Sequence, residues 1–364
     1  MKITTIVGAR PQFIKAAVIS RTIRTFPQIE EVIVHTGQHF DENMSDIFFD
    51  EMEIPMPHYN LNINGLGHGA MTGQMMEKIE EVLLKEQPDW VLVYGDTNST
   101  LAGALAAKKL HLKVAHVEAG LRSFNMQMPE EINRIVTDRI SDLLFCPTEQ
   151  AMKNLELEGF EHFSCKIMKV GDVMQDAAIF YSSKAQKPQT EIPDRYILAT
   201  VHRAENTDDS TKLKSIFSAL DELAKEYGLI LPLHPRTKQK LQQINFNFET
   251  SFITFIEPVG YLEMIYLLKN CKLVMTDSGG LQKEAYFFRK PALTLRQETE
   301  WVELVQHGFN KIVGSDKTQI IENTELMLAE TDFNFDLNLY GNGKAGEKIV
   351  EEILSEKNNY WEII

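Results

Sequence analysis

Short apolar runs alternate with segments of helical pattern along the chain, and this alternation predicts its secondary structure. In the first half, Trp90–Tyr94 and Lys113–Val117 are apolar runs of strand length, and the stretch between them, Leu101–Leu110, has a helical pattern. Strand, helix and strand in this order form a parallel βαβ unit, in which both strands end at the same edge of the sheet. Open α/β sheets bind their ligands at that edge.

The same alternation continues through the rest of the first half. The long helix predicted at 71–86 is followed by Gln87-Pro88, as expected when proline follows a helix C-terminus. The order of elements predicts a doubly wound parallel sheet. Its further strands are expected at 3–7, 31–35 and 143–146, and its further helices at 11–25, 43–52 and 130–141.

A polar, proline-containing stretch, Ser182–Asp194, marks a boundary region, after which the alternation starts again. The last predicted helix, Ala345–Glu356, is expected to cross back to the first domain. We therefore predict two Rossmann-like domains of α/β class, residues 1–170 with 345–364 and residues 171–344, with a ligand cleft between them. In the second half, strands are expected at 195–201, 229–233, 252–255, 273–276 and 292–295, and helices at 211–227, 261–269 and 281–288.

The composition is that of an ordinary globular protein with an acidic surface. The 364 residues suggest about two domains, and the net charge of −15 disfavours nucleic acid and anionic lipid as partners. No apolar stretch reaches the roughly 18–20 residues that span a bilayer, and we expect no signal segment before the first strand. Three distant cysteines, Cys146, Cys165 and Cys271, are expected to be buried free thiols in a reducing cytoplasm.

Acidic residues gather at the predicted ligand-binding edge. Asp96 and Glu118 each follow one strand of the βαβ unit, and Glu130 and Glu131 lie in the connection after its second strand. We expect these carboxylates to surround one crevice and to favour acid–base chemistry there. Asp96 and Glu118 have an alternative role as helix caps or ion-pair residues, since Asp96-Thr-Asn-Ser resembles an N-cap run.

The segment Gly8–Lys15 follows the first strand and opens the first helix. Pro11 suits the first turn of a helix, where its missing N–H costs nothing. Arg10 and Lys15 are candidates for binding an anionic ligand near the positive end of that helix. An ordinary strand–helix turn with a solvated arginine explains the same residues equally well.

Two glycine-rich segments differ in what they predict. Gly65–Ala70 formally fits the G-x-G-x-x-A pattern, but it follows a polar stretch and lacks an acidic partner about 20 positions later, so we expect a flexible loop. In Thr276–Gly280, between an apolar run and a helix, Ser278, Gly279 and Gly280 are candidates for binding a phosphate. Glu284, one turn into that helix, suits a ribose diol. An ordinary tight turn is the alternative.

Basic residues follow two strands of the second half. His202 and Arg203 follow one strand, and His234 follows the next, which brings their side chains to the carboxyl edge of the sheet. Two such groups at equivalent places favour a role in binding, although a single histidine there is more often structural. No H-x-x-x-H or C-x-x-C pattern accompanies them, and no metal is expected.

Six segments, taken in order, carry a further signal. They are Gly8–Lys15, Tyr94–Ser99, His116–Arg122, Pro129–Arg134, His202–Asn206 and Asp277–Gly280. Together they resemble the non-hydrolysing UDP-N-acetylglucosamine 2-epimerase family, over residues 1 to about 315. The resemblance implies a GT-B fold with the active site between its two domains, and a homodimer as the usual assembly. It also implies a UDP-sugar substrate and no metal or NAD cofactor.

Three departures from the family pattern resemble one of its branches. Thr299–Glu303 replaces the usual Thr-Glu-Arg-Pro-Glu, Arg122–Pro129 lacks the usual Pro-Trp, and Gly67–Gly73 has the loop of that branch. The branch acts on UDP-2,3-diacetamido-2,3-dideoxy-glucuronic acid and supplies surface polysaccharide. His35–His39 is kept from the enzymes that their own substrate activates, but Phe40-Asp41 replaces the expected polar partners, so we do not expect such activation.

The resemblance implies that C2 of the sugar is inverted by loss and return of UDP. Asp96, Glu118 and Glu130 would then supply acid–base groups and stabilise positive charge at C1, and His202 would steady the departing diphosphate. Glu131 is an alternative to Glu130. The other candidate substrate-binding residues are Arg10, Lys15, Arg122, Arg203, His234, Ser278, Gly279, Gly280 and Glu284, and either Arg122 or Arg296 is a candidate partner for a sugar carboxylate.

Other functions suit the same residues. A GT-B glycosyltransferase would bind UDP in the same way but would need an acceptor, and a hydrolysing epimerase would release free sugar. A protein that only binds nucleotide sugars is the alternative from a different class. The acidic cluster at Asp96, Glu118, Glu130 and Glu131 favours the epimerase.

Overall fold

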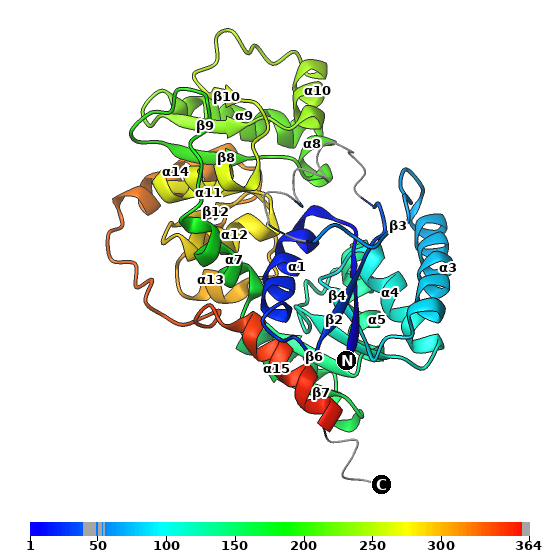
Figure 1. Cartoon of the computed structure of the whole chain (residues 1–364). Coiled ribbons are helices and arrows are strands. Elements are labelled where there is room, and N and C mark those ends of the chain that lie inside the picture. The colour runs from blue at the N-terminus through cyan, green and yellow to red at the C-terminus, as the bar shows by residue number, and fades with distance from the viewer. Residues whose placement is uncertain (39–48, 50–52, 54, 359–364) are drawn as a thin grey trace. The chain divides into compact units, whose positions relative to one another are not determined.

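The computed structural model describes residues 1–38, 49, 53 and 55–358 of the chain, without the side chains of Arg10, Lys357 and Asn358. Of the predicted helix 43–52, only Phe49 is among these residues, so that prediction lies outside what the structure describes. The chain divides into two compact units (Figure 1). Unit 1 comprises Met1–Ala177 and the segment from Asn338 onward, and unit 2 comprises Ala178–Leu337. The first division falls inside a helix, after the predicted limit at residue 170.

Unit 1 contains a sheet of seven parallel strands among its described residues, in the order β3-β2-β1-β4-β5-β6-β7. The strands are β1 (Lys2–Val7), β2 (Glu30–His35), β3 (Tyr59–Asn60), β4 (Trp90–Tyr94), β5 (Lys113–Val117), β6 (Leu143–Cys146) and β7 (Lys166–Lys169). The helices are α1 (Arg10–Ile23), α3 (His68–Glu86), α4 (Asn98–Lys109), α5 (Pro129–Ile140), α6 (Glu149–Leu157), α7 (Val173–Ser182) and α15 (Ala345–Asn358), with a 3-10 turn η1 (Phe160–His162).

The sheet of unit 1 is buried between helices. Ile6, Val34 and Val93 form one core with apolar residues of α3 and α4. Helix α15 packs against α1, as Figure 1 shows. A Cβ atom on Gly346 would lie 2.8 Å from Cγ1 of Val18, so this helix pair needs a glycine at its contact. The C-terminal helix therefore belongs to the first unit, as the sequence predicts.

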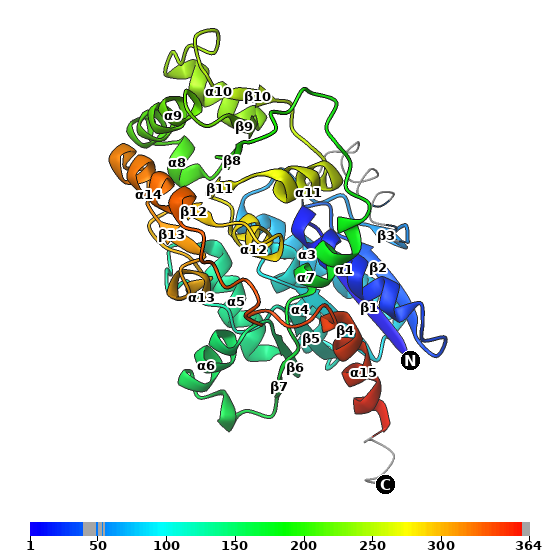
Figure 2. The ribbon, with the colours of Figure 1, turned by 90° about the vertical axis from the view of Figure 1, so that its left-hand side faces the viewer.

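Unit 2 contains six parallel strands, in the order β10-β9-β8-β11-β12-β13, and Figure 2 shows its sheet from a second direction. Both faces of β8 are buried, because Ile197 and Ala199 pack in one hydrophobic cluster and Leu198 packs in another. The strands are β8 (Ile197–Thr200), β9 (Leu229–Pro232), β10 (Thr254–Ile256), β11 (Leu273–Thr276), β12 (Ala292–Thr294) and β13 (Asn310–Ile312). The helices are α8 (Ala204–Thr207), α9 (Ser210–Ala224), α10 (Pro235–Gln243), α11 (Tyr261–Asn270), α12 (Gly279–Phe287), α13 (Val302–Gln306) and α14 (Lys317–Ala329).

These two sheets confirm the predicted α/β class, but several details differ from the prediction. The segment Gly65–Ala70 is not a loop throughout, because α3 begins at His68. That helix ends at Glu86, and its C-cap Gln87 takes the left-handed conformation (φ 45°) before Pro88, as the helix-stop pattern predicts. The elements that the sequence pattern did not predict are β3, α6, η1, β7, α7, α8, α10, α13, β13 and α14.

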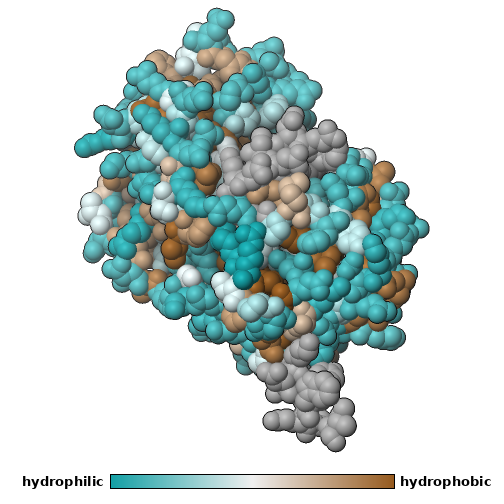
Figure 3. All heavy atoms as spheres, viewed as in Figure 1, coloured by the Kyte–Doolittle hydropathy of each residue, from teal (hydrophilic) through white to brown (hydrophobic). Residues whose placement is uncertain are grey.

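The surface agrees with the composition, whereas the prediction of three buried thiols is right for two cysteines and wrong for Cys165. Hydrophilic residues cover most of the face shown in Figure 3, with apolar residues scattered among them. Cys146 and Cys271 are buried free thiols, and Cys165 is a free thiol that is only partly buried. Burial raises the pKa of the Cys271 thiol to about 12, which suppresses its reactivity. Among the helices that the structure describes, none has the length and apolar character needed to cross a membrane.

Candidate functional site

The carboxyl ends of β4 and β5 form the centre of the candidate site in unit 1. Each strand ends in a turn with left-handed backbone, at Gly95 (φ 62°) and at Glu118 (φ 72°). The two turns are joined, since the Gly95 amide donates to the Val117 carbonyl over 3.0 Å. Left-handed backbone is unfavourable for a residue with a side chain, so the turn at Glu118 departs from the conformation that glutamate prefers. The structure therefore places Asp96 and Glu118 on neighbouring turns, as predicted.

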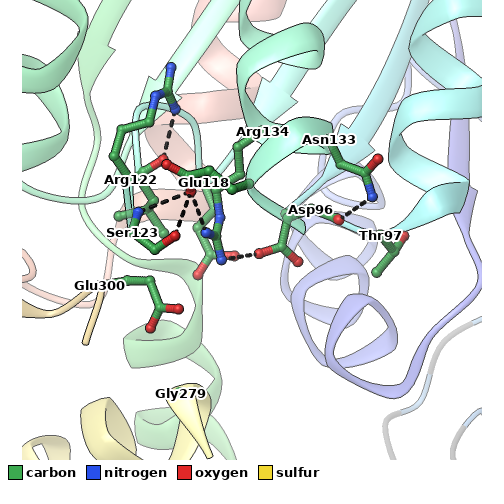
Figure 4. Close-up of polar contacts among 12 residues, drawn as sticks. Asp96, Thr97, Glu118, Arg122, Ser123, Asn133, Arg134, Gly279 and Glu300 are labelled. Carbon is green, nitrogen blue, oxygen red and sulfur yellow. Dashed lines mark hydrogen bonds and ion pairs between the residues drawn. The ribbon is translucent and has the colours of Figure 1, made fainter. Parts of the chain in front are cut away.

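Asp96 is held by helix α5. Arg134 donates from Nη2 to Asp96 Oδ2 over 2.5 Å, and Asn133 donates to the Asp96 carbonyl over 2.8 Å, as Figure 4 shows. Of the two alternative roles for Asp96, the ion pair is present, with Arg134, but the helix cap is wrong. The N-cap of α4 is Thr97, whose hydroxyl accepts from the Thr100 amide. The carboxylate of Asp96 keeps 29% of its surface exposed and can reach a ligand.

Glu118 forms an ion pair with Lys15 of α1. Both side chains are 9% exposed, so the two charges neutralise each other largely out of water. The absence of a side chain at Gly95 makes room for this pair. A Cβ atom there would lie 3.1 Å from Nζ of Lys15 and 3.3 Å from Oε2 of Glu118. Lys15, which the sequence marks as a candidate for binding an anion, thus contacts an acidic side chain of the site.

The two adjacent glutamates at the start of α5 differ in their surroundings. Glu131 is fully buried and accepts from the amides of Ser123 and Phe124 (2.9 and 2.8 Å), and from Arg134 Nη1 (2.8 Å). Glu130 is half-buried and has no hydrogen-bond or ion-pair partner among the described residues. Glu131 therefore shapes the loop before α5, whereas the carboxylate of Glu130 remains available to a ligand.

Arg122 belongs to a buried network and not to a ligand-binding surface. Its guanidinium donates to both carboxylate oxygens of Glu158 (2.6 and 2.8 Å), to Asp138 (2.7 Å) and to the Leu121 carbonyl (2.7 Å). Burial works against the charge of Arg122, but the hydrogen bonds and negative charges of Glu158 and Asp138 outweigh it and raise the pKa of Arg122. The geometry does not support the predicted role of Arg122 in binding substrate.

The turn between β1 and α1 is built around Gln12. Its Oε1 accepts from the amides of Gly8 (2.8 Å) and Ala9 (3.0 Å), and its Nε2 donates to the Tyr94 carbonyl over 2.8 Å. Gly8 has no room for a side chain, since a Cβ atom would lie 2.0 Å from the Thr36 hydroxyl oxygen. Arg10 is the first residue of α1, and its side chain lies outside the described set.

In unit 2, Asp277 organises the loop after β8. The Asp277 carboxylate is fully buried and accepts from the amides of His202 (3.0 and 3.1 Å) and Arg203 (3.0 Å), and from Asn206 Nδ2 (3.2 Å). Nδ1 of His202 lies 3.3 Å from Asp277 Oδ1, and the imidazole is 40% exposed. The guanidinium of Arg203 has no partner among the side chains that the structure describes. The loop thus presents His202 and Arg203 at the carboxyl edge of the sheet, as predicted.

His234 lies close to His202 at the end of the neighbouring strand. The centroids of the two imidazole rings are 6.3 Å apart. His234 is also the N-cap of α10, because its Nδ1 accepts from the Arg236 amide over 3.2 Å. Burial, and then the charges of His202 and Arg236, lower the pKa of His234. The structure therefore brings together the two histidines that the sequence places at separate strand ends.

The glycine pair after β11 opens helix α12. Ser278 is its N-cap and Gly279 and Gly280 are its first residues. No side chain caps this end, and a Cβ atom on Gly280 would meet open space, so the first amides of α12 are accessible to an anion. Glu284 lies one turn further and is 6% exposed.

Sequence reasoning missed the segment that supports this turn. The indole of Trp301 donates from Nε1 to the Gly279 carbonyl over 2.9 Å, and Thr299 donates to Gln282 over 2.6 Å. Both belong to Thr299–Glu303, which the sequence identifies only as a departure from the family pattern. Arg296, just before it, pairs with Glu205 and Glu300 and so acts as an ion-pair residue.

The arrangement provides carboxylates at the carboxyl edge of one sheet and cationic and amide donors at that of the other. The carboxylates of unit 1 suit acid–base chemistry, and the donors of unit 2 suit the binding of an anionic group. Within the described parts of the chain, there is no group of three or more His, Cys, Asp or Glu side chains that could hold a metal ion.

Known proteins resemble the chain over nearly its whole length. The sequence model of a family described as UDP-N-acetylglucosamine 2-epimerase matches residues 21–354. A UDP-2,3-diacetamido-2,3-dideoxy-D-glucuronate 2-epimerase from Pseudomonas aeruginosa is 56% identical over 353 residues, which cover 96% of this chain and 99% of that protein. A UDP-N-acetylglucosamine 2-epimerase from Methanocaldococcus jannaschii is 47% identical over 363 residues, or 96% of this chain and 98% of that protein.

Solved structures of such proteins have the same fold. The crystal structure of Methanocaldococcus jannaschii UDP-GlcNAc 2-epimerase in complex with UDP-GlcNAc and UDP has a TM-score of 0.89, with 46% identity and coverage of 98% of this chain and 100% of that chain. The UDP-GlcNAc 2-epimerase of Neisseria meningitidis bound to UDP-GlcNAc has a TM-score of 0.88 at 32% identity, with coverage of 98% of this chain and 100% of that chain. The two doubly wound units therefore form the predicted GT-B fold.

Proposed function

The chain belongs to the UDP-N-acetylglucosamine 2-epimerase family, the non-hydrolysing UDP-sugar 2-epimerases, and from this membership we propose that it inverts C2 of UDP-2,3-diacetamido-2,3-dideoxy-glucuronate. The observation that carries the choice of substrate is the 56% identity to the Pseudomonas enzyme that is named for this sugar. The departures in Arg122–Pro129 and Thr299–Glu303 support the same choice.

The reaction that we propose breaks and remakes the anomeric bond. The bond between C1 and the UDP oxygen breaks, and UDP leaves with the electron pair, so that C1 becomes an oxocarbenium-like centre. A base then removes the C2 proton, and the C–H electrons form the C1–C2 double bond of a glycal. Protonation of C2 from the other face and return of the UDP oxygen to C1 give the epimer. Nothing is oxidised overall, and no external reductant is needed.

The acidic residues of unit 1 suit this chemistry. Two faces of C2 need two acid–base groups, and we assign them among Asp96, Glu118 and Glu130. The pairing of Asp96 with Arg134 and of Glu118 with Lys15 favours ionised carboxylates, which stabilise positive charge at C1 and accept a proton. Glu130, which lacks a partner in the described structure, is one of the two groups that we expect to change protonation during turnover.

The residues of unit 2 suit the binding of UDP. The accessible amides of Gly279 and Gly280 would receive a phosphate, with Ser278 beside them. His202 and His234 would donate to the diphosphate as negative charge develops on it. Glu284 is the candidate for the ribose. Arg10, at the start of α1, is a further candidate for the phosphates.

The sugar carboxylate needs a cation, and Arg203 is the best candidate for it. The guanidinium groups of Arg122 and Arg296 are both used in ion pairs inside their own units. Arg203 has no such partner among the described side chains and lies three residues after the end of β8. A planar guanidinium binds a carboxylate through two hydrogen bonds, which suits this role.

UDP-N-acetylglucosamine is the second candidate substrate, because the Methanocaldococcus enzyme named for it is 47% identical to this chain. Assays of the purified protein with both sugars decide between the two. We expect kcat/KM for the diacetamido-glucuronate to exceed that for UDP-N-acetylglucosamine by at least about 10-fold, since a site that binds a charged group rejects the analogue that lacks it. Equal or reversed values would assign the chain to UDP-N-acetylglucosamine.

We also propose a homodimer in the cytoplasm, with a role in surface polysaccharide synthesis. These proposals follow from the family resemblance alone. Analytical ultracentrifugation tests the assembly state, and loss of surface polysaccharide on deletion of the gene tests the role.

A further inference from the structure

The imidazole of His116, near the end of β5, lies between two hydrogen-bond acceptors. Its Nδ1 is 2.7 Å from Asp138 Oδ1, and its Nε2 is 2.7 Å from the carbonyl oxygen of Gly95. The ring is fully buried. A carbonyl oxygen can only accept, so Nε2 carries a hydrogen. The protonation of Nδ1 then depends on the state of Asp138.

Several donors hold Asp138 in its ionised form. Its Oδ2 accepts from the Gly120 amide over 3.1 Å and from Arg122 Nη1 over 2.7 Å. The Arg122 guanidinium is always charged and, together with the Gly120 amide, favours the ionised carboxylate without any contribution from a charge on His116. An ionised carboxylate can only accept, and Nδ1 of His116 must therefore donate to it as well.

We propose that His116 is a buried imidazolium cation and that, with Asp138, it is a positioning residue for the candidate acid–base groups. The role of those groups rests on the proposed function, whereas the protonation state does not. A ring that donates from both nitrogens bridges helix α5 to the Gly95–Asp96 peptide. Neither neutral tautomer could make both bonds to an ionised Asp138.

The peptide that His116 binds, between Gly95 and Asp96, lies between the candidate acid–base side chains. It leads directly to Asp96, and its Gly95 borders the pair of Lys15 and Glu118, as the 3.1 and 3.3 Å separations from a Cβ atom there indicate. Asp138 reaches the second turn too, through the Gly120 amide two residues after Glu118. His116 and Asp138 thus fix the turns after β4 and β5 relative to each other without touching a ligand.

The direct test is an NMR measurement on the full-length protein labelled with 15N-histidine at pH 7. Long-range 1H–15N correlations distinguish a doubly protonated ring from each neutral tautomer by its nitrogen shifts. Backbone correlations of the unaltered protein assign the His116 ring, so that no variant needs to fold. We expect both ring nitrogens of His116 to carry hydrogen. A single protonated nitrogen would overturn the proposal.

Kinetics test the positioning role. In H116Q one donor is lost, and we expect kcat to fall about 10- to 100-fold while KM for the UDP-sugar changes less than about 3-fold, because a small misplacement of the acid–base groups slows chemistry more than binding. H162Q, at an imidazole that is 78% exposed, is the matched control and should leave both constants unchanged. An unchanged kcat in folded H116Q would overturn the positioning role. If the protein turned over no UDP-sugar at all, the proposed function would fail, and the NMR result would still decide the protonation state.

Discussion

Arg134 donates from one nitrogen to Asp96 over 2.5 Å and from another to Glu131 over 2.8 Å. One guanidinium therefore connects a candidate acid–base residue with the residue that shapes the neighbouring loop. Because Arg134 is 7% exposed, this connection is shielded from solvent and only weakly screened by salt. Helix α5 thus positions the turn after β4 as well as the loop before the helix.

Replacement of Arg134 should impair catalysis and also lower stability, because buried Glu131 loses its cationic partner. In R134Q the charge beside Asp96 is lost, and we expect kcat to fall roughly 10²-fold, the lower end of what a positioned acid–base group contributes. R139Q, on the same helix but exposed, is the control and should keep its activity. Steady-state kinetics measure the effect. Activity of R134Q within about 3-fold of the unaltered protein would contradict the assignment of Asp96.

The two glutamates at the start of α5 should respond differently to the same substitution. E130Q removes an acid–base group without a partner in the described structure, so we expect kcat to fall about 10²- to 10⁴-fold with an unchanged unfolding temperature. E131Q weakens buried hydrogen bonds to two amides and to Arg134, and we expect it to cost about 1–3 kcal/mol of stability. Calorimetry and kinetics on both variants check this contrast. Loss of stability in E130Q together with loss of activity alone in E131Q would assign the acid–base role to Glu131 and the structural role to Glu130.

Asp277 should control the affinity for UDP. An asparagine there offers one acceptor oxygen where the carboxylate now receives several donors, so D277N should loosen the loop that carries His202 and Arg203. We expect UDP to bind about 10-fold more weakly, as measured by titration calorimetry. D336N alters an exposed surface pair and is the control. Unchanged UDP affinity in folded D277N would argue against a UDP site at this loop.

Asp176 should make stability depend on pH. Burial raises its pKa from 3.8 to about 6, although the Gly346 amide donates to it over 2.8 Å. Between these two values the folded state holds the proton more tightly than the unfolded state does, so stability decreases as the pH rises through this window and is level above it. We expect a decrease of about 2 kcal/mol, and D176N should lack it. Denaturant unfolding at several pH values between 4 and 7 measures the unfolding free energy. The same dependence of that free energy on pH in D176N and in the unaltered protein would refute the prediction.

Most strands of both sheets were predictable, since buried parallel strands are short apolar runs, but β3, β7 and β13 were not. Residues of β5 and β6 match the predicted ranges, and all five residues of β4 are buried. The pattern fails where an element has few apolar positions. Helix α10 buries only Thr237 and Leu241, and β7 begins and ends with lysine at the edge of its sheet. Such elements form because their neighbours pack on them, which a local pattern does not reveal.

The residues of the candidate site also differ in how far the sequence predicts them. The places of Asp96, Glu118 and His202 follow from the rule that parallel strands end at one edge, and this rule needs only local sequence. The role of a long basic side chain depends on distant partners. Arg122 is bound by Asp138 and Glu158, which lie far along the chain, and Lys15 is bound by Glu118. His116 and Asp138 were missed for the same reason, since only the fold brings them together.

Proton exchange at C2 tests the central claim most directly. The account requires that the C2 proton leave the sugar and that a proton return to C2 from the other face, supplied by a group that exchanges with solvent. The purified protein is incubated with its UDP-sugar in heavy water, and the product is examined by NMR and mass spectrometry. We predict one deuterium at C2 of the epimer. An epimer that retains only protium at C2 would contradict the account.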